Sequence, residues 1–134
     1  MEQDQRLRGL LELLRWDAQG WVDAHGSWSL QCLQQLGAPG INAARDLLLN
    51  SDDSSHRLNA AWLLARSEIP EAYAALAEAL DERFDDEVLE TIFENAVLFP
   101  AALLNQQFVT KARELAERGR LPEVRDFLRR VDGG

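Results

Sequence analysis

The side chain in this sequence best suited to nucleophilic chemistry is the single cysteine, Cys32. A cysteine becomes a reactive thiolate when neighbouring cations or a helix N-terminus lower its pKa. Cys32 lies in a largely apolar stretch, residues 29–33, and no basic residue is near it in the sequence. We therefore predict that Cys32 is a buried structural thiol rather than a catalytic nucleophile.

The two histidines, His25 and His56, are the next candidates because imidazole and carboxylate groups together bind zinc or manganese. A metal site would require Asp23 and His25 to meet Asp52, Asp53 or His56 across the fold. Their spacing matches no established metal motif. The interpretation we favour is that His56 is an exposed residue in the first turn of a helix. We predict no metal and no cofactor, and a metal-dependent enzyme is the least favoured function.

The densest charge cluster is acidic and covers residues 81–87. It lacks the glycine and the ligand spacing of an EF-hand loop, so calcium binding is not predicted. Asp85 and Asp86 are placed to cap the following helix, where carboxylates also interact favourably with the helix dipole. Glu90 and Glu94, one and two turns later, would extend an acidic surface for a basic partner. Capping and docking both stay open.

No glycine-rich loop, oxyanion device or activated nucleophile accompanies these carboxylates, so we predict that the protein is not an enzyme. The formal net charge of −9 disfavours non-specific binding to nucleic acid, which requires cations to displace counterions. The charge is also uneven: residues 1–110 hold seven basic and eighteen acidic side chains, whereas residues 111–134 hold seven basic and five acidic. Such asymmetry would orient a charged partner, but ordinary solvated helix faces are the interpretation that we favour.

The elements that would position these residues are predicted to be helices within one domain. With 134 residues, of which 46% are hydrophobic, the chain is long enough for a core. It has no apolar run near the roughly 20 residues that cross a bilayer. Its charged start lacks the apolar stretch of a secretory signal, and its lone cysteine fits a reducing compartment. We expect a soluble, cytoplasmic protein without a membrane partner.

An internal repeat lies between residues 39 and 99. A step of 31 residues places Pro39 over Pro70 and aligns two helical hairpins of similar apolar spacing. A period near thirty residues is typical of α-solenoids. The aligned pairs are Ala43/Ala74, Ala44/Ala75, Leu49/Leu80, Leu58/Leu89, Ala61/Ile92, Trp62/Phe93 and Ala65/Ala96.

The second helix of the first copy resembles the HEAT-like repeats of the phycobilisome-lyase type. Those repeats tend to carry an early arginine, an Ala-Ala pair and a small-Leu-small ending. The matching residues here are Arg57, Ala60, Ala61, Leu64 and Ala65, whereas the second copy has Val88, Thr91 and Ile92 instead of the arginine and the pair. The resemblance implies a solenoid that binds proteins along a curved face lined by the second helices.

Further helices are predicted on both sides of the repeat. Residues 3–16 place leucines at i, i+3, i+4 and i+7, which predicts an amphipathic helix. Residues 16–28 show no sustained period, and we expect an irregular connection with a short helical turn at 21–24. Ser27 would then cap a helix over residues 28–36, with Gly37 as its stop. Helices near residues 104–119 and 121–131 would form an atypical third hairpin.

The predicted fold is therefore all-α: a short, right-handed α-solenoid of two to three HEAT-like hairpins with capping helices at both ends, seven or eight helices in total and no strands. Its single domain, 1–134, would comprise an N-terminal cap (1–38), two hairpins (39–99) and C-terminal helices (100–134).

Tryptophans divide between the repeat and the irregular connection. Trp62 lies on the apolar stripe of the first copy and is assigned to the core. Trp16, Trp21 and Trp28 belong to the connection, where they would either cover the end of the core or form a binding hot spot. Both uses stay open.

The function we predict is non-catalytic binding of a basic protein through an acidic helical face. The candidate contact residues are Arg57, Asn59 and Arg66 on the first copy and Asp85, Asp86, Glu87, Glu90 and Glu94 on the second. Alternatives are a bacterial immunity or antitoxin-type inhibitor of a toxin enzyme, and a secretion chaperone or assembly factor. The thirteen arginines against one lysine fit a high-GC bacterial source. The oligomeric state is not predicted.

Overall fold

The computed structural model describes residues 2–80, 86–96, 106–119 and 122–132. In these residues the chain forms eight α-helices and a short π-helix, and it forms no strand. The elements in order are α1 (Glu2–Leu14), η1 (Val22–Gly26), α2 (Ser27–Leu36), α3 (Ala38–Asn50), α4 (Ser54–Arg66), α5 (Pro70–Ala79), α6 (Asp86–Ala96), α7 (Gln106–Glu117) and α8 (Pro122–Asp132). The predicted all-helical class is thus confirmed for the described residues.

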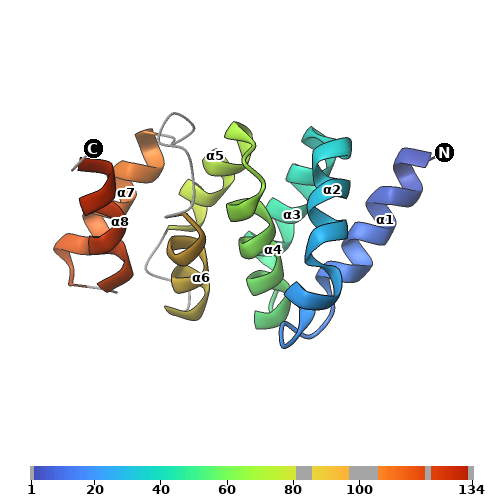
Figure 1. The fold of residues 1–134 in the computed structure, drawn as a ribbon, viewed down its shortest axis with the longest axis horizontal. Coiled ribbons are helices and arrows are strands. Elements are labelled where there is room, and N and C mark those ends of the chain that lie inside the picture. The colour runs from blue at the N-terminus through green and yellow to red at the C-terminus, as the bar shows by residue number, and fades with distance from the viewer. Residues whose placement is uncertain (1, 81–85, 97–105, 120–121, 133–134) are drawn as a thin grey trace.

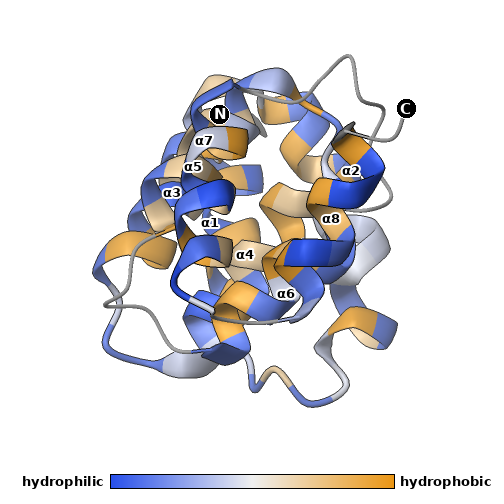
Figure 2. Cartoon of the chain, turned by 90° about the vertical axis from the view of Figure 1, so that its left-hand side faces the viewer, coloured by the Kyte–Doolittle hydropathy of each residue, from blue (hydrophilic) through white to orange (hydrophobic). Residues whose placement is uncertain are grey.

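The helices form two layers, and alternate helices along the chain belong to the same layer. In one layer α1 packs on α3, α3 on α5 and α5 on α7. In the other, α2 packs on α4, α4 on α6 and α6 on α8. Figure 1 shows the row from the N-terminus on the right to the C-terminus on the left, and Figure 2, turned by 90°, shows α3, α5 and α7 on the opposite side from α2 and α8. Each hydrophobic helix face is therefore covered by the facing layer.

The first helix follows its leucine pattern. Leu10 and Leu14 are fully buried, while Leu7 and Leu11 pack partly buried against the same core. The helix ends at Leu14, two residues before the predicted boundary, because the chain there turns toward the second layer. The predicted amphipathic stripe is confirmed.

The predicted irregular connection and its cap at Ser27 are partly wrong. The chain is helical from Trp21 onward, since both Trp21 and Gly26 have helical backbone angles and η1 runs directly into α2. Ser27 is therefore an internal helical residue and makes no capping hydrogen bond. The predicted stop is confirmed: Gly37 has φ +64°, a conformation that glycine adopts easily, and its N–H donates to the carbonyl of Leu33 at 2.9 Å.

Two predicted helix starts are confirmed by the prolines in their first turns. Pro39 lies in the first turn of α3, and Pro70 begins α5. Asp53 caps α4, because its Oδ1 accepts hydrogen bonds from the N–H groups of Ser55 (2.8 Å) and His56 (3.4 Å).

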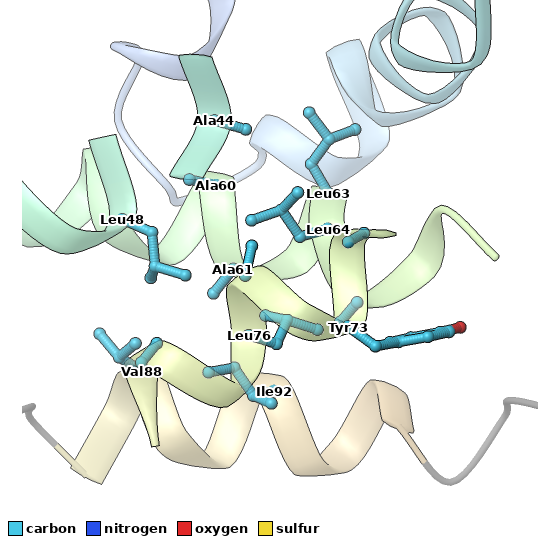
Figure 3. Close-up of a cluster of buried hydrophobic side chains, with 14 of the residues drawn as sticks. Ala44, Leu48, Ala60, Ala61, Leu63, Leu64, Tyr73, Leu76, Val88 and Ile92 are labelled. Carbon is cyan, nitrogen blue, oxygen red and sulfur yellow. The ribbon is translucent and has the colours of Figure 1, made fainter. Parts of the chain in front are cut away.

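Buried residues that the 31-residue step aligns occupy the shared core of α3 to α6. Ala44 and Ala75 are both buried, as are Ala61 and Ile92. Figure 3 shows side chains from all four helices converging, with the small residues of α4 in the middle. Small side chains allow the axes of packed helices to approach closely, so the alanines let α4 lie between its neighbours.

An aromatic cluster closes the core at the C-terminal end. The rings of Phe93 (α6), Phe108 (α7) and Phe127 (α8) lie with centroids 5.4–5.6 Å apart. All three rings are fully buried or nearly so, and Phe93 is one of the residues that the 31-residue step aligns.

Several predicted features lie outside the described residues. They are the turn at 81–85 with Asp85, the end of the second hairpin at 97–99, Leu104 of the seventh helix, and Leu121 at the start of the last helix.

Candidate functional site

The acidic side chains of α6 lie opposite its buried stripe. Val88, Leu89, Ile92 and Phe93 are fully buried against the rest of the protein. The remaining face carries exposed Asp86, Glu87 and Glu94 and half-buried Glu90. Spacings of three, four and seven residues place these carboxylates on one side of the helix. We call this set, together with Glu123 of α8, the acidic face.

Glu123 joins the face through the packing of α8 on α6. Burial raises the pKa of Glu90 above its ordinary value, and the carboxylates of Glu123, Glu94, Asp86 and Glu87 raise it further. Among the residues that the structure describes, no cation is among the groups that shift it. Within the same described residues, the Oε2 atom of Glu123 is buried without a hydrogen-bond partner. The acidic face therefore brings like charges together around Glu90, and a cationic group would relieve their repulsion.

Negative charge is concentrated around this face in the sequence as well. Residues 68–94 hold ten acidic side chains and one basic, a net of −9 that equals the net charge of the whole chain. The bidentate pair between Arg45 of α3 and Glu78 of α5 neutralises one of these carboxylates, and the hydrogen bond from Arg45 lowers the pKa of Glu78.

Asn59 does not lie on a binding face, which corrects the prediction. Its side chain is only 2% exposed, and its Nδ2 donates to the carbonyls of Leu14 (3.2 Å) and Trp16 (2.8 Å). The chain leaves α1 at this point, so Asn59 satisfies carbonyl groups that the helix end leaves without partners. Asn59 was expected to face outward because it is a polar residue on the second helix of the first predicted hairpin, whereas its side chain faces the end of α1.

The two arginines predicted with Asn59 are engaged in local contacts. The Nη1 of Arg57 donates to the carbonyl of Ser51 at 2.7 Å, which ties the start of α4 to the turn before it. Arg66 is exposed, and its guanidinium lies 5.6 Å from the ring centroid of Trp62, within the range of a cation–π contact. Of the three residues predicted for the first copy, only Arg66 is exposed.

Asp86 and Glu87 occupy the first turn of α6, where their charge favours the helix dipole. Glu123 was missed by the sequence reasoning. Its place in the face depends on how α8 packs on α6, and the only available signal was Pro122, which predicted the start of that helix.

Cys32 is buried, as predicted, at 3% exposure. Its thiol lies 3.5 Å from the backbone carbonyl of Arg6. Burial raises the pKa of the Cys32 thiol above its ordinary value, and Arg6 offsets part of this effect. The geometry therefore keeps the thiol protonated and disfavours a nucleophilic role.

The histidines do not meet. His25 stacks edge-on against Trp16, with 4.4 Å between the ring centroids. His56 Nδ1 lies 3.2 Å from the hydroxyl of Ser51, and its Nε2 lies 3.8 Å from Asp53. His56 is half-buried rather than exposed, which corrects its predicted environment. Throughout the described ranges, no three His, Cys, Asp or Glu side chains gather in a group that could hold a metal ion.

The tryptophans of the N-terminal segment divide into two kinds. Trp21 is a core residue: it is 1% exposed, donates its indole N–H to the carbonyl of Leu13 at 2.7 Å, and contacts Trp62 edge-on. Trp16 and Trp28 are 54% and 46% exposed. Trp62, predicted in the core, packs against it but is only partly buried.

No protein-family model matches this chain, and no curated protein and no solved structure was found to be similar to it. None of the helices in the part of the chain that the structure describes is both long enough and apolar enough to pass through a bilayer.

Proposed function

We propose that this protein is a non-catalytic binding module that holds a basic protein against the acidic face of α6 and α8. The observation that carries the proposal is the gathering of Glu90 and Glu123 with their acidic neighbours, where burial and then the neighbouring carboxylates raise the pKa of Glu90. Like charges brought together at a surface destabilise the free protein and are relieved by a partner that supplies cations. Lysine and arginine side chains of a partner are suited to this role.

The proposal includes the solenoid architecture and the HEAT-like relationship. Supporting both are the 31-residue step, the burial of Ala44 with Ala75 and of Ala61 with Ile92, and the packing of alternate helices in two layers. In such an array each hairpin contacts mainly its neighbours, and the second helices present one continuous surface. Helices α4, α6 and α8 would supply that surface here, and α6 with α8 carries its acidic part.

Inhibition of a basic enzyme and protection of a basic secreted or assembling protein are two uses of such a face. Both need stoichiometric binding, and in both electrostatic steering would accelerate encounter with the partner.

Capture from an extract of the producing cells tests the proposal. The bait variant is Glu87→Lys/Glu94→Lys, because both residues are exposed and their reversal leaves the core unchanged. The matched control is Glu114→Lys/Glu117→Lys on α7, where both side chains are also exposed and the change in net charge is the same.

We expect a basic protein to be retained in equal stoichiometry by the unmodified bait and by the α7 control, and to be lost from the α6 variant. Retention by all three baits, or equal loss from both variants, would show that the acidic face is not the binding surface.

A further inference from the structure

A pocket that is separate from the acidic face lies between α1 and α2, at the N-terminal end of the row. It is lined by Arg6, Trp28, Gln31, Cys32 and Gln35 and has a volume of about 220 Å³. The four residues from α2 recur at spacings of three, four and seven, so they share one helix face. Arg6 is supplied by α1, which packs against that face. The pocket is thus built by two elements of fixed relative position.

The cation of the pocket is Arg6, whose side chain is exposed. Its positive charge acts on the Cys32 thiol, another residue that lines the pocket, and lowers the pKa of that thiol against the larger effect of burial. Gln31 and Gln35 add amide groups that donate and accept hydrogen bonds. One guanidinium with neighbouring amides suits a singly charged carboxylate better than a doubly charged phosphate.

The aromatic wall of the pocket is Trp28. Its ring lies over α1 at Gly9, where an added Cβ would come within 3.3 Å of Cη2. The absence of a side chain at Gly9 therefore allows the indole to approach α1 closely. The side chain is nevertheless 46% exposed, and no aromatic side chain in the described ranges stacks on it. An exposed indole fixed beside a cation offers a surface on which a planar ring can stack.

The size of the pocket limits the ligand to a small molecule. A cavity of about 150 Å³ accepts benzene, and the present volume is about half as large again. One ring with a carboxylate substituent fits this space. Cys32, at the floor, is a buried protonated thiol and contributes a soft, weakly polar surface rather than a reactive group.

We infer that this pocket binds a small aromatic carboxylate, with the carboxylate on Arg6 and the ring on Trp28. The carboxylate can belong to a free aromatic acid or to an aromatic amino acid at the end of a peptide. This site lies on α1 and α2, is independent of the proposed protein partner, and can be tested without that partner.

Sodium benzoate is the probe for a free acid, and benzamide is its neutral counterpart. N-acetylphenylalanine presents the same carboxylate in the form of a peptide terminus. Binding is measured on the full chain by the shift of the Trp28 indole N–H resonance, which Trp28→Phe identifies. The binding variant is Arg6→Gln, and the control is Arg8→Gln, an exposed arginine on the same helix that does not line the pocket.

We expect benzoate or N-acetylphenylalanine to shift the Trp28 resonance with a dissociation constant on the order of 1 mM, as suits a ligand of this size. Arg6→Gln should weaken binding at least tenfold and Arg8→Gln less than twofold, and benzamide should bind at least tenfold more weakly than benzoate. The stronger of the two acids identifies the source of the carboxylate.

Three results would overturn the inference: no shift of the Trp28 resonance with either acid at 20 times the expected dissociation constant, equal weakening by the two arginine variants, or equal binding of benzamide and benzoate. Thermal unfolding of both variants guards against a folding defect, because each replaces an exposed side chain.

Discussion

Replacing Asn59 by alanine should destabilise the protein, because the asparagine side chain joins two helices by hydrogen bonds. Asn59 lies on α4, and its Nδ2 bridges the carbonyls of Leu14 and Trp16 at the point where the chain leaves α1. The alanine variant loses both hydrogen bonds. Among the residues that the structure describes, no other polar side chain donates to the carbonyl of Leu14, which lies in the interior.

The magnitude follows from the two bonds and their burial. A net hydrogen bond contributes about 1 kcal/mol, and a buried carbonyl left without a donor costs about 1–3 kcal/mol. Alanine also favours the helix over asparagine by roughly 0.6 kcal/mol, which acts in the opposite direction. The matched control Asn42→Ala, at an exposed position of α3, gains the same helix propensity without losing a buried bond. The difference between the two variants should be about 2–4 kcal/mol.

Urea unfolding of the two variants, followed by far-UV circular dichroism, measures this difference. With a slope of about 1.5 kcal/mol per molar urea, the midpoint of Asn59→Ala should fall more than about 1 M below that of Asn42→Ala. If the two midpoints agree within about 0.3 M at equal slopes, the bridge from α4 to the end of α1 does not contribute to stability and the reasoning is refuted.

Two further variants test the C-terminal core and the acidic face. Phe127→Ala removes a fully buried ring from the cluster with Phe93 and Phe108 and should lower the free energy of unfolding by about 3–5 kcal/mol. The control Leu128→Ala, at the half-buried neighbouring residue, should lower it clearly less. Equal decreases in the two variants would mean that the aromatic cluster is not packed as described. Glu90→Gln should raise the free energy of unfolding at pH 7. Folding raises the pKa of Glu90, so the stability that this carboxyl contributes is present below its pKa in the unfolded chain and is lost as the pH rises through its pKa in the folded protein. The gain over the parent protein should disappear below about pH 4, where both side chains are neutral, and a gain that is constant from pH 7 to pH 3.5 would exclude the charge-crowding explanation.

Much of the fold could be predicted because helix periodicity and local turn chemistry are properties of neighbouring residues. The leucine spacing of α1, the prolines that open α3 and α5, the Asp53 cap and the Gly37 stop all depend on contacts within a few residues. Each of these features was visible in the sequence and is present in the structure.

The N-terminal connection was harder to predict for a physical reason. Gly20 and Gly26 suggested a break, but Gly26 is a packing residue rather than a turn: an added Cβ would lie 2.9 Å from the ring of Trp62. The helix continues through it because the indole occupies the space of the missing side chain. Only the tertiary position of Trp62 distinguishes these two uses of glycine.

The candidate site was predictable along one helix and unpredictable across helices. The carboxylates of α6 lie opposite a clear apolar stripe, so Glu87, Glu90 and Glu94 could be placed on one face from spacing alone. Glu123 and Asn59 could not be placed from spacing alone. Glu123 belongs to the acidic face only because α8 lies next to α6, and Asn59 is turned away from the surface only because its side chain hydrogen-bonds to the end of α1. The pocket of Arg6 and Trp28 depends in the same way on how α1 packs against α2.

The affinity of the captured partner for two charge-reversed variants tests the central claim most directly. Glu87→Lys/Glu94→Lys and Glu114→Lys/Glu117→Lys change the net charge equally but place the new cations on α6 and α7, respectively. The affinities are measured by titration calorimetry at about 0.15 M salt, where exposed charges more than about 8 Å apart are largely screened. The α6 variant should bind the partner at least about 30-fold more weakly than the parent protein does, and the affinity of the α7 variant should stay within about threefold of the parent value. Equal weakening by both variants would attribute binding to net charge alone and would contradict an acidic face built by α6 and α8.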